Sequence, residues 1–112
     1  MKEAKIKESK DKRRFERFKI KLNVKFIDLN KNKAGEAFTQ DFCAEGIGLI
    51  TQEELSPKTP VELWLYIRNH HDPLYLKGEV VWSKPIDFNT YRVGINLEQA
   101  ELIRLSRIFR CT

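Results

Sequence analysis

Between Phe18 and Phe26 the chain alternates apolar and polar side chains at every position. The apolar members are Phe18, Ile20, Leu22, Val24 and Phe26, and the residues between them are Lys19, Lys21, Asn23 and Lys25. A period of two is typical of a β-strand that buries one face and exposes the other. We therefore predict a strand over this segment, with one apolar face and one cationic face.

Five further segments have the composition or periodicity of strands. They are Glu36–Phe42, Gly46–Thr51, Val61–Ile67, Leu74–Trp82 and Tyr91–Leu97. Turn-forming residues separate them at Asn30–Gly35 and at Ser56–Pro60, and we expect Lys84–Thr90 to join the last two. A chain of 112 residues fits one domain. Six short strands with short turns predict an antiparallel barrel or sandwich.

The end of the chain changes to a helical period. Apolar residues recur mostly at spacings of three and four, and they are Leu97, Ala100, Leu102, Ile103, Leu105, Ile108 and Phe109. We predict an amphipathic helix over about 98–110, with Asn96 as its N-cap. Its apolar stripe is expected to cover the barrel, although it could instead pair with a partner helix.

The basic excess lies at the beginning of the chain. The net charge is +5, with nine Lys and Arg against four acids in residues 1–20 and twelve of each in residues 21–112. Residues 1–12 mix Lys and Glu with few apolar side chains, which favours a flexible charged tail. Arg13, Arg14 and Arg17 alternate instead with Phe15 and Phe18, so we expect these arginines to be held on the folded body. A neutral body with one basic end predicts a compact anionic ligand.

The residue content favours neither catalysis nor a metal site. The sequence has no Gly-rich phosphate loop, no nucleophile motif beside a histidine and no paired carboxylates in an apolar context. His70 and His71 are adjacent in a turn-like stretch, and Cys43 and Cys111 are too few to hold zinc alone. We expect reduced thiols, a cytoplasmic location and no membrane insertion, since no apolar run reaches the length of a span.

A second polar cluster lies at Asp41–Gly48, where the second predicted strand turns into the third. A carboxylate before two glycines can accept paired N–H donors, such as those of a guanine edge, while the glycines allow a ligand to approach closely. Arginine forks match phosphate oxygens and the O6 and N7 atoms of guanine. The same segment could equally be a plain turn that Asp41 closes.

The two clusters together resemble the PilZ domain family, whose signature is RxxxR followed by (D/N)xSxxG. The matching residues are Arg13 and Arg17, then Asp41, Cys43 and Gly46, and residues 78–82 and 91–97 are similar to the late strands of that family. The resemblance implies an all-β fold with a C-terminal helix, in the form of a six-stranded antiparallel barrel. It divides the chain into a tail over 1–12 and a PilZ-like domain over 13–112, with the barrel at about 18–97.

The resemblance implies a receptor for the bacterial second messenger cyclic di-GMP, and not an enzyme. Carried over by position, Arg13 and Arg17 would contact phosphate and guanine, Asp41 would pair with guanine, and Gly46 would shape the turn. Arg14 would be an auxiliary contact. Trp82 falls where some members place an aromatic residue beside the ligand, although it could equally well pack in the core. Cys43 replaces the serine of the family pattern, and a thiol is the weaker hydrogen-bonding group.

The expected partners are cyclic di-GMP and an unidentified protein effector, with the chain a monomer or weak dimer and no DNA or RNA bound. Two alternatives stay open. One is a PilZ-shaped interaction module that does not bind nucleotide, which Cys43 favours and the arginines oppose. The other is a basic barrel for single-stranded nucleic acid, which Trp64, Tyr66 and Phe26 would favour. The neutral charge of residues 21–112 opposes it, and these aromatics alternate as core residues would.

Overall fold

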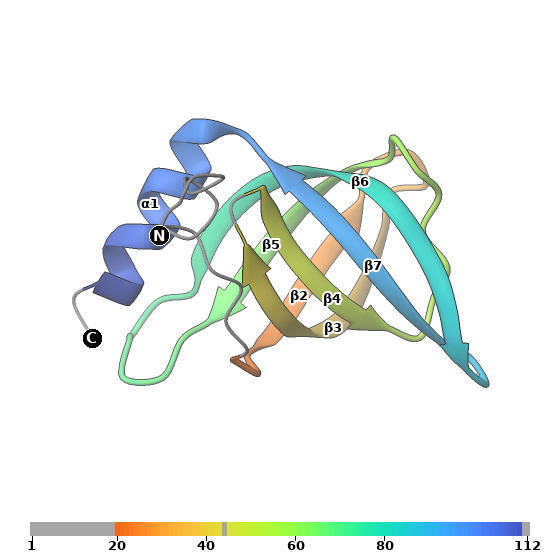
Figure 1. Cartoon of the computed structure of the whole chain (residues 1–112), viewed down its shortest axis with the longest axis horizontal. Coiled ribbons are helices and arrows are strands. Elements are labelled where there is room, and N and C mark those ends of the chain that lie inside the picture. Colours follow the sequence, from red (N-terminus) through yellow and green to blue (C-terminus); the bar gives the residue numbers. More distant parts are fainter. Residues whose placement is uncertain (1–19, 44, 111–112) are drawn as a thin grey trace, which may run out of the picture.

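The structure is a computed structural model that describes residues 20–43 and 45–110. Within these ranges six antiparallel strands close into a barrel in the order β2-β3-β4-β7-β6-β5, followed by one helix (Figure 1). The elements are β2 (Asn23–Asp28), β3 (Lys33–Cys43), β4 (Gly46–Thr51), β5 (Pro60–Tyr66), β6 (Leu74–Asp87), β7 (Thr90–Leu97) and α1 (Gln99–Arg110). The predicted six-stranded antiparallel barrel with a C-terminal helix is confirmed.

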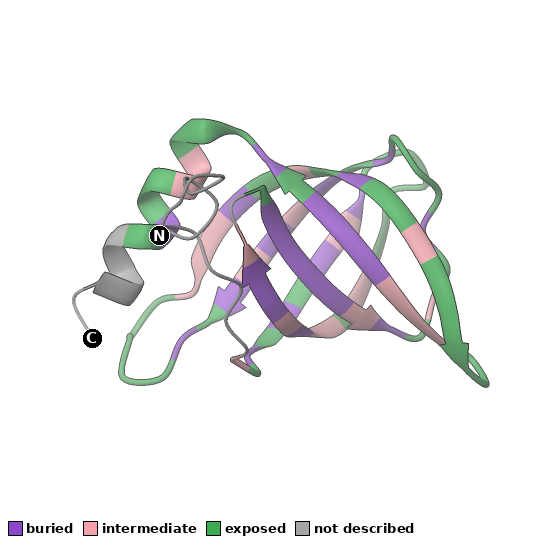
Figure 2. Cartoon of the chain, in the orientation of Figure 1, coloured by how far each residue is buried: buried purple, intermediate pink, exposed green. Residues whose placement is uncertain are grey.

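The core fills the inside of the barrel with aliphatic side chains from every strand. Buried positions alternate with more exposed ones along β2 and β5, as the period of two predicts (Figure 2). Leu49, Leu63, Leu65, Leu76, Val80 and Val93 are fully buried. Side chains from all six strands therefore meet in one core, which fixes which face of each strand is turned outward.

The first strand begins later than predicted. Phe18 lies outside the described residues, and β2 starts at Asn23 rather than continuing back through Ile20. Ile20 and Leu22 are instead attached to β3 by Thr39, whose hydroxyl donates to the Ile20 carbonyl and accepts from the Leu22 N–H at 2.8 Å. The Thr39 N–H also donates to the Leu22 carbonyl at 2.9 Å. Thr39 thus holds the segment that leads from the N-terminal arginines to the barrel.

Replacing Thr39 with valine should destabilise this entry segment. The side chain is buried, so valine keeps the volume but leaves the Leu22 N–H and the Ile20 carbonyl without their hydroxyl partner. We expect a loss of about 1–3 kcal/mol in the free energy of unfolding. Urea denaturation of Thr39→Val and Thr39→Ser measures it, and serine should retain most of the stability. Equal stability of the valine variant and the unaltered chain would contradict the assignment.

Two β-bulges turn polar and aromatic side chains outward where simple alternation would bury them. In β3 the register shifts between Thr39 and Asp41, so Thr39 pairs with the core residue Leu49 while Asp41 pairs with Gly48. In β6 it shifts between Val80 and Trp82, so Val80 stays in the core and Trp82 pairs with Gly94. An extra residue in one strand re-aims the side chains that follow it. Asp41 and Trp82 consequently share the outer face of the barrel.

The hairpin between β6 and β7 is longer than predicted. Lys84–Thr90 was expected to be a connection, but β6 runs to Asp87, and Asn89 takes a positive φ of 48° in the turn (Figure 1). Pro85 does not end the strand. Among the described residues β5 pairs with β6 only as far as Glu79, so Pro85 lies where β6 has a free edge.

The C-terminal helix packs on the barrel, as the sequence predicted, but its cap was wrong. Asn96 lies in β7, paired with Gly46 and Glu79, and the Glu98 carbonyl accepts the first helical bonds from Glu101 and Leu102. Leu105 joins the core. Asn96 cannot cap the helix because it belongs to the sheet, and its strand pairing was not visible from sequence spacing alone.

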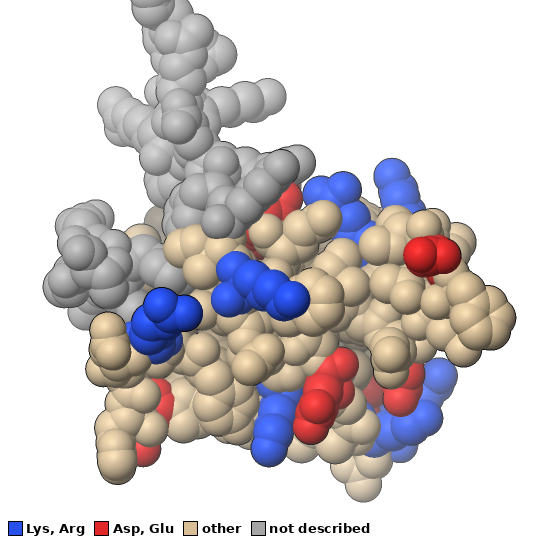
Figure 3. Space-filling model, turned by 90° about the horizontal axis from the view of Figure 1, so that it is seen from below, with Lys and Arg blue, Asp and Glu red and all other residues tan. Residues whose placement is uncertain are grey.

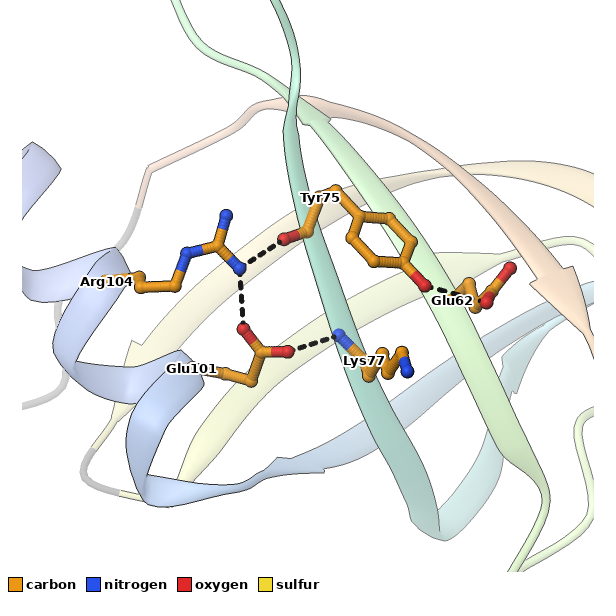
Figure 4. Close-up of polar contacts among 5 residues, drawn as sticks. All are labelled: Glu62, Tyr75, Lys77, Glu101 and Arg104. Carbon is orange, nitrogen blue, oxygen red and sulfur yellow. Dashed lines mark hydrogen bonds and ion pairs between the residues drawn. The ribbon is translucent and has the colours of Figure 1, made fainter.

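A polar clamp fixes the exposed side of α1 to β6 (Figure 4). Arg104 donates to the Tyr75 carbonyl at 3.0 Å and pairs with Glu101 at 2.9 Å, and Glu101 accepts from the Lys77 N–H at 3.2 Å. The Tyr75 hydroxyl donates to Glu62 at 2.7 Å. This hydrogen bond, followed by burial and the nearby carboxylates, raises the pKa of Tyr75 above its ordinary value. The helix is therefore tied to the barrel by polar contacts as well as by its apolar stripe.

Candidate binding site on the outer face of the barrel

One row of residues crosses four adjacent strands on the outer face. Asp41 of β3 pairs with Gly48 of β4, Gly48 pairs with Gly94 of β7, and Gly94 pairs with Trp82 of β6. The row therefore has a carboxylate at one end, an indole at the other and two residues without side chains between them. This is a shallow floor bounded by a hydrogen-bond acceptor and a flat aromatic ring.

The two glycines are required by the residues at the ends of the row. A Cβ at Gly48 would overlap Oδ1 of Asp41, and a Cβ at Gly94 would lie 2.6 Å from the indole nitrogen of Trp82. The Asp41 carboxylate thus lies against Gly48 and the Trp82 ring lies against Gly94, so neither side chain points away from the sheet. Asp41 is buried, while Trp82 keeps 37% of its surface exposed. An aromatic face left open in this way can stack on a planar ligand.

Two cations lie beside Trp82 in the next row. Arg92 pairs with Lys84 across β7 and β6, and the Arg92 guanidinium and the Lys84 ammonium each lie 5.6 Å from the Trp82 ring. Arg92 also reaches Asp41, with 3.4 Å between Nη2 and Oδ2. Like charges opposite each other on neighbouring strands repel. A bound anion would relieve that repulsion, so this side of the face suits a ligand with negative charge.

Cys43 and Gly46 form the row on the other side of Asp41. They pair with each other where β3 turns into β4, and Gly46 also pairs with Asn96. Gly46 was expected to shape the turn, in which a glycine can take a positive φ, but no described glycine has one. Its requirement is close approach instead, because a Cβ would overlap the carbonyl oxygen of Ile95 in β7.

The structure thus places four of the predicted site residues on one face: Asp41, Cys43, Gly46 and Trp82. Arg13, Arg14 and Arg17 lie outside the described residues, as do the predicted tail and Cys111. The sequence analysis missed Arg92, Lys84 and Gly94 as site residues. Period-two alternation along β7 could have found two of these three, since Arg92 and Gly94 fall between the core residues of that strand.

The aromatic residues considered for nucleic-acid binding lie away from the glycine floor. Phe26 is buried in the core, so it cannot stack on a base. Trp64 and Tyr66 were read as core-like, but they alternate with buried Leu63 and Leu65 and face outward. With Lys25 they line an open groove of about 490 Å³ on β2, β3 and β5. This groove lies on strands other than β4 and β7, which carry the glycine floor.

The described residues bear on the expectations for metal ligands, membrane helices and surface charge. Within residues 20–43 and 45–110, no three His, Cys, Asp or Glu side chains gather as metal ligands. In the same ranges no helix has the length and apolar content needed to cross a membrane. Figure 3 shows Lys and Arg interspersed with Asp and Glu on the face it views, as the balanced charge of residues 21–112 predicts.

The outer face of this small closed barrel thus carries two glycines between a carboxylate and an exposed indole, with a guanidinium 5.6 Å from the indole ring. The sequence profile of the PilZ domain matches residues 11–112, and the chain belongs to the PilZ domain family. This is generally a family of cyclic di-GMP receptors, whose domains act as binding and adaptor modules rather than enzymes. A comparison with curated protein sequences gave no match.

Proposed function

We propose that this chain is a cyclic di-GMP receptor that binds its ligand on the face formed by Asp41, Gly48, Gly94 and Trp82. The observation that carries the proposal is the gathering of the motif residues Asp41, Cys43 and Gly46 in two adjacent rows, next to an exposed indole. A guanine base is flat and has N–H donors on one edge. Trp82 offers the flat face and Asp41 the acceptors.

The phosphates of the ligand need cations, which the chain supplies from two directions. Arg92 and Lys84 border the site on the barrel. Arg13, Arg14 and Arg17 precede the barrel in sequence, and the segment from Ile20 to Leu22 is attached to β3 at Thr39, two residues before Asp41. Charge-assisted hydrogen bonds from arginine to phosphate are among the strongest that a protein makes.

Competition binding tests the assignment. Equilibrium dialysis against labelled cyclic di-GMP at about physiological salt should show saturable binding, and neither cyclic di-AMP nor a single-stranded oligonucleotide should displace the label. Displacement by the oligonucleotide with a steep salt dependence would favour the nucleic-acid alternative. Absence of saturable binding would favour the PilZ-shaped interaction module.

We further propose that the ligand pins the arginine segment to the barrel and creates a surface that a protein effector recognises. The phosphates would neutralise Arg13, Arg14 and Arg17 and hold them against β3, so binding would be coupled to an ordering of the segment. Hydrogen exchange of residues 12–19 should slow at saturating ligand. Unchanged exchange with and without ligand would refute this mechanism and leave the binding assignment standing.

Replacing Cys43 with serine should tighten binding. Cys43 lies beside Asp41 in the next row, at the position where the family pattern has serine, and a hydroxyl is the better hydrogen-bonding group. One recovered neutral hydrogen bond is worth about 0.5–1.5 kcal/mol, which corresponds to a roughly two- to twelvefold lower Kd. Calorimetry of Cys43→Ser and Cys43→Ala measures it. Weaker binding by the serine variant would show that the thiol itself is preferred.

A further inference from the structure

Arg92 lies at the centre of the proposed site, although it belongs to neither sequence motif. Its Nη2 is 3.4 Å from Oδ2 of Asp41, and its guanidinium lies 5.6 Å from the centre of the Trp82 ring. Its side chain is 33% exposed, against 7% for that of Asp41. The guanidinium therefore joins the carboxylate and the indole and remains open to solvent on one side.

The hydrogen bonds of Arg92 are incomplete in the free protein. Its Nε is buried and has no hydrogen-bond partner among residues 20–43 and 45–110. The contact with Asp41 is long for a charge-assisted bond, which normally spans about 2.7–2.9 Å. Lys84, another cation, is its pairing partner on the neighbouring strand β6. A ligand oxygen at this place would accept a hydrogen bond from the Arg92 guanidinium, whose donors the barrel does not fully satisfy.

The pair presents acceptors and donors side by side. The carboxylate of Asp41 accepts only, and the guanidinium of Arg92 donates only. Guanine has the matching order along its Watson–Crick edge, with the 2-amino group and N1–H as donors followed by O6 as acceptor. Adenine has a donor amino group where guanine has O6, and an acceptor N1 where guanine has N1–H. The amino group of adenine would therefore face the donors of Arg92, and its N1 acceptor would face the acceptors of Asp41, so neither hydrogen bond could form.

We propose that Arg92 is a specificity-determining residue that donates to O6 of a guanine whose N1–H and 2-amino group are bound by Asp41. This inference rests on the proposed function. Arg92 and Asp41 then bind one base edge together, and Trp82 packs beside the pair. An adenine-containing dinucleotide is rejected by both members of the pair.

The test compares Arg92→Ala with Lys84→Ala by calorimetry. Both changes remove one positive charge at the same distance from the same ring, but only Arg92 contacts Asp41. We expect Arg92→Ala to weaken cyclic di-GMP binding about ten- to a hundredfold, as the loss of one charge-assisted hydrogen bond does. Lys84→Ala removes only an attraction for phosphate, so it should weaken binding by about two- to fivefold, less than Arg92→Ala does. Arg92→Lys, which restores one donor and the charge, should recover part of the loss.

A second ligand separates direct contact from positioning of Asp41. Cyclic di-IMP has the same O6 and N1–H but lacks the 2-amino group. It should bind more weakly only because it cannot donate that hydrogen bond to the Asp41 carboxylate. If Arg92 contacts O6 itself, the ratio of the two affinities is the same in the unaltered chain and in Arg92→Ala. A ratio that collapses toward one in Arg92→Ala would show that Arg92 only positions Asp41, which would overturn the inference.

Other outcomes bear on the two proposals separately. Equal losses in Arg92→Ala and Lys84→Ala would refute the role of Arg92 and leave the receptor assignment intact. An unaltered chain that binds no cyclic di-GMP would refute the receptor assignment itself. The thermal midpoint of each variant without ligand shows whether a loss of affinity is caused by unfolding. If Arg92→Ala is unfolded, the affinity of folded Arg92→Lys for cyclic di-GMP tests the role of Arg92 instead.

Discussion

Replacing Gly46 with alanine is expected to unfold most of the chain at temperatures where the unaltered protein is folded. The added Cβ would overlap the carbonyl oxygen of Ile95, which is backbone of the neighbouring strand β7. Backbone cannot turn aside as a side chain can, so β4 and β7 must separate. We expect a loss of about 4 kcal/mol, near the upper end for single substitutions, and a fall in Tm of roughly 15 °C or more.

Gly48→Ala is the matched control on the same strand. Its Cβ would meet the Asp41 carboxylate, which is a side chain and can rotate away. The Tm of this variant should fall by much less than that of Gly46→Ala, while its affinity for cyclic di-GMP should drop because Asp41 is displaced. Thermal unfolding followed by circular dichroism compares the two. Similar Tm values for Gly46→Ala and the unaltered chain would contradict the packing described for β4 and β7.

Replacing Asp41 with alanine should remove most of the affinity for cyclic di-GMP. The carboxylate would accept two donors of one guanine edge, and each charged hydrogen bond contributes about 1.5–3 kcal/mol. The combined loss corresponds to a Kd raised by roughly two to four orders of magnitude. The bulge at Thr39 and Asp41 places no other carboxylate in this row, in which Asp41 faces two glycines and Trp82.

Asp41→Asn provides the graded control for this experiment. An amide of the same size keeps one acceptor oxygen but turns an amino group toward the donors of guanine. It should bind more tightly than Asp41→Ala and more weakly than the unaltered chain. Calorimetry gives the three affinities, and thermal unfolding shows whether each variant is folded. A Kd for folded Asp41→Ala within about twofold of that of the unaltered chain would remove Asp41 from the site.

The fold could be predicted because local pattern and tertiary packing agree along most of the chain. Leu63 and Leu65 alternate with outward residues on β5, and Asp28 closes the turn after β2 by accepting the N–H of Asn30 at 2.9 Å. Such signals are short-ranged in sequence, so they are visible before the structure is known. Four of the six strands were predicted to within about three residues at each end, whereas β2 begins at Asn23 rather than Phe18 and β6 ends at Asp87 rather than Trp82.

The site was harder to predict because it depends on departures from alternation. Counting by two from Thr39 places Asp41 inside the barrel, and counting by two from Val80 does the same for Trp82. The bulges reverse both, and a bulge has no clear signature in one sequence. Arg92 was missed for a related reason, since its partner Asp41 is 51 residues away in the chain. Pairing at that distance follows from the order of strands in the closed barrel.

The central claim, that this PilZ domain is a cyclic di-GMP receptor, is tested most directly by isothermal titration calorimetry at about physiological salt. The unaltered chain and Arg17→Ala are titrated with cyclic di-GMP under the same conditions. We predict saturable heat with a defined stoichiometry for the unaltered chain, and loss of that heat in Arg17→Ala. An absence of heat in the unaltered chain at high ligand, confirmed by a lack of competition, would contradict the claim.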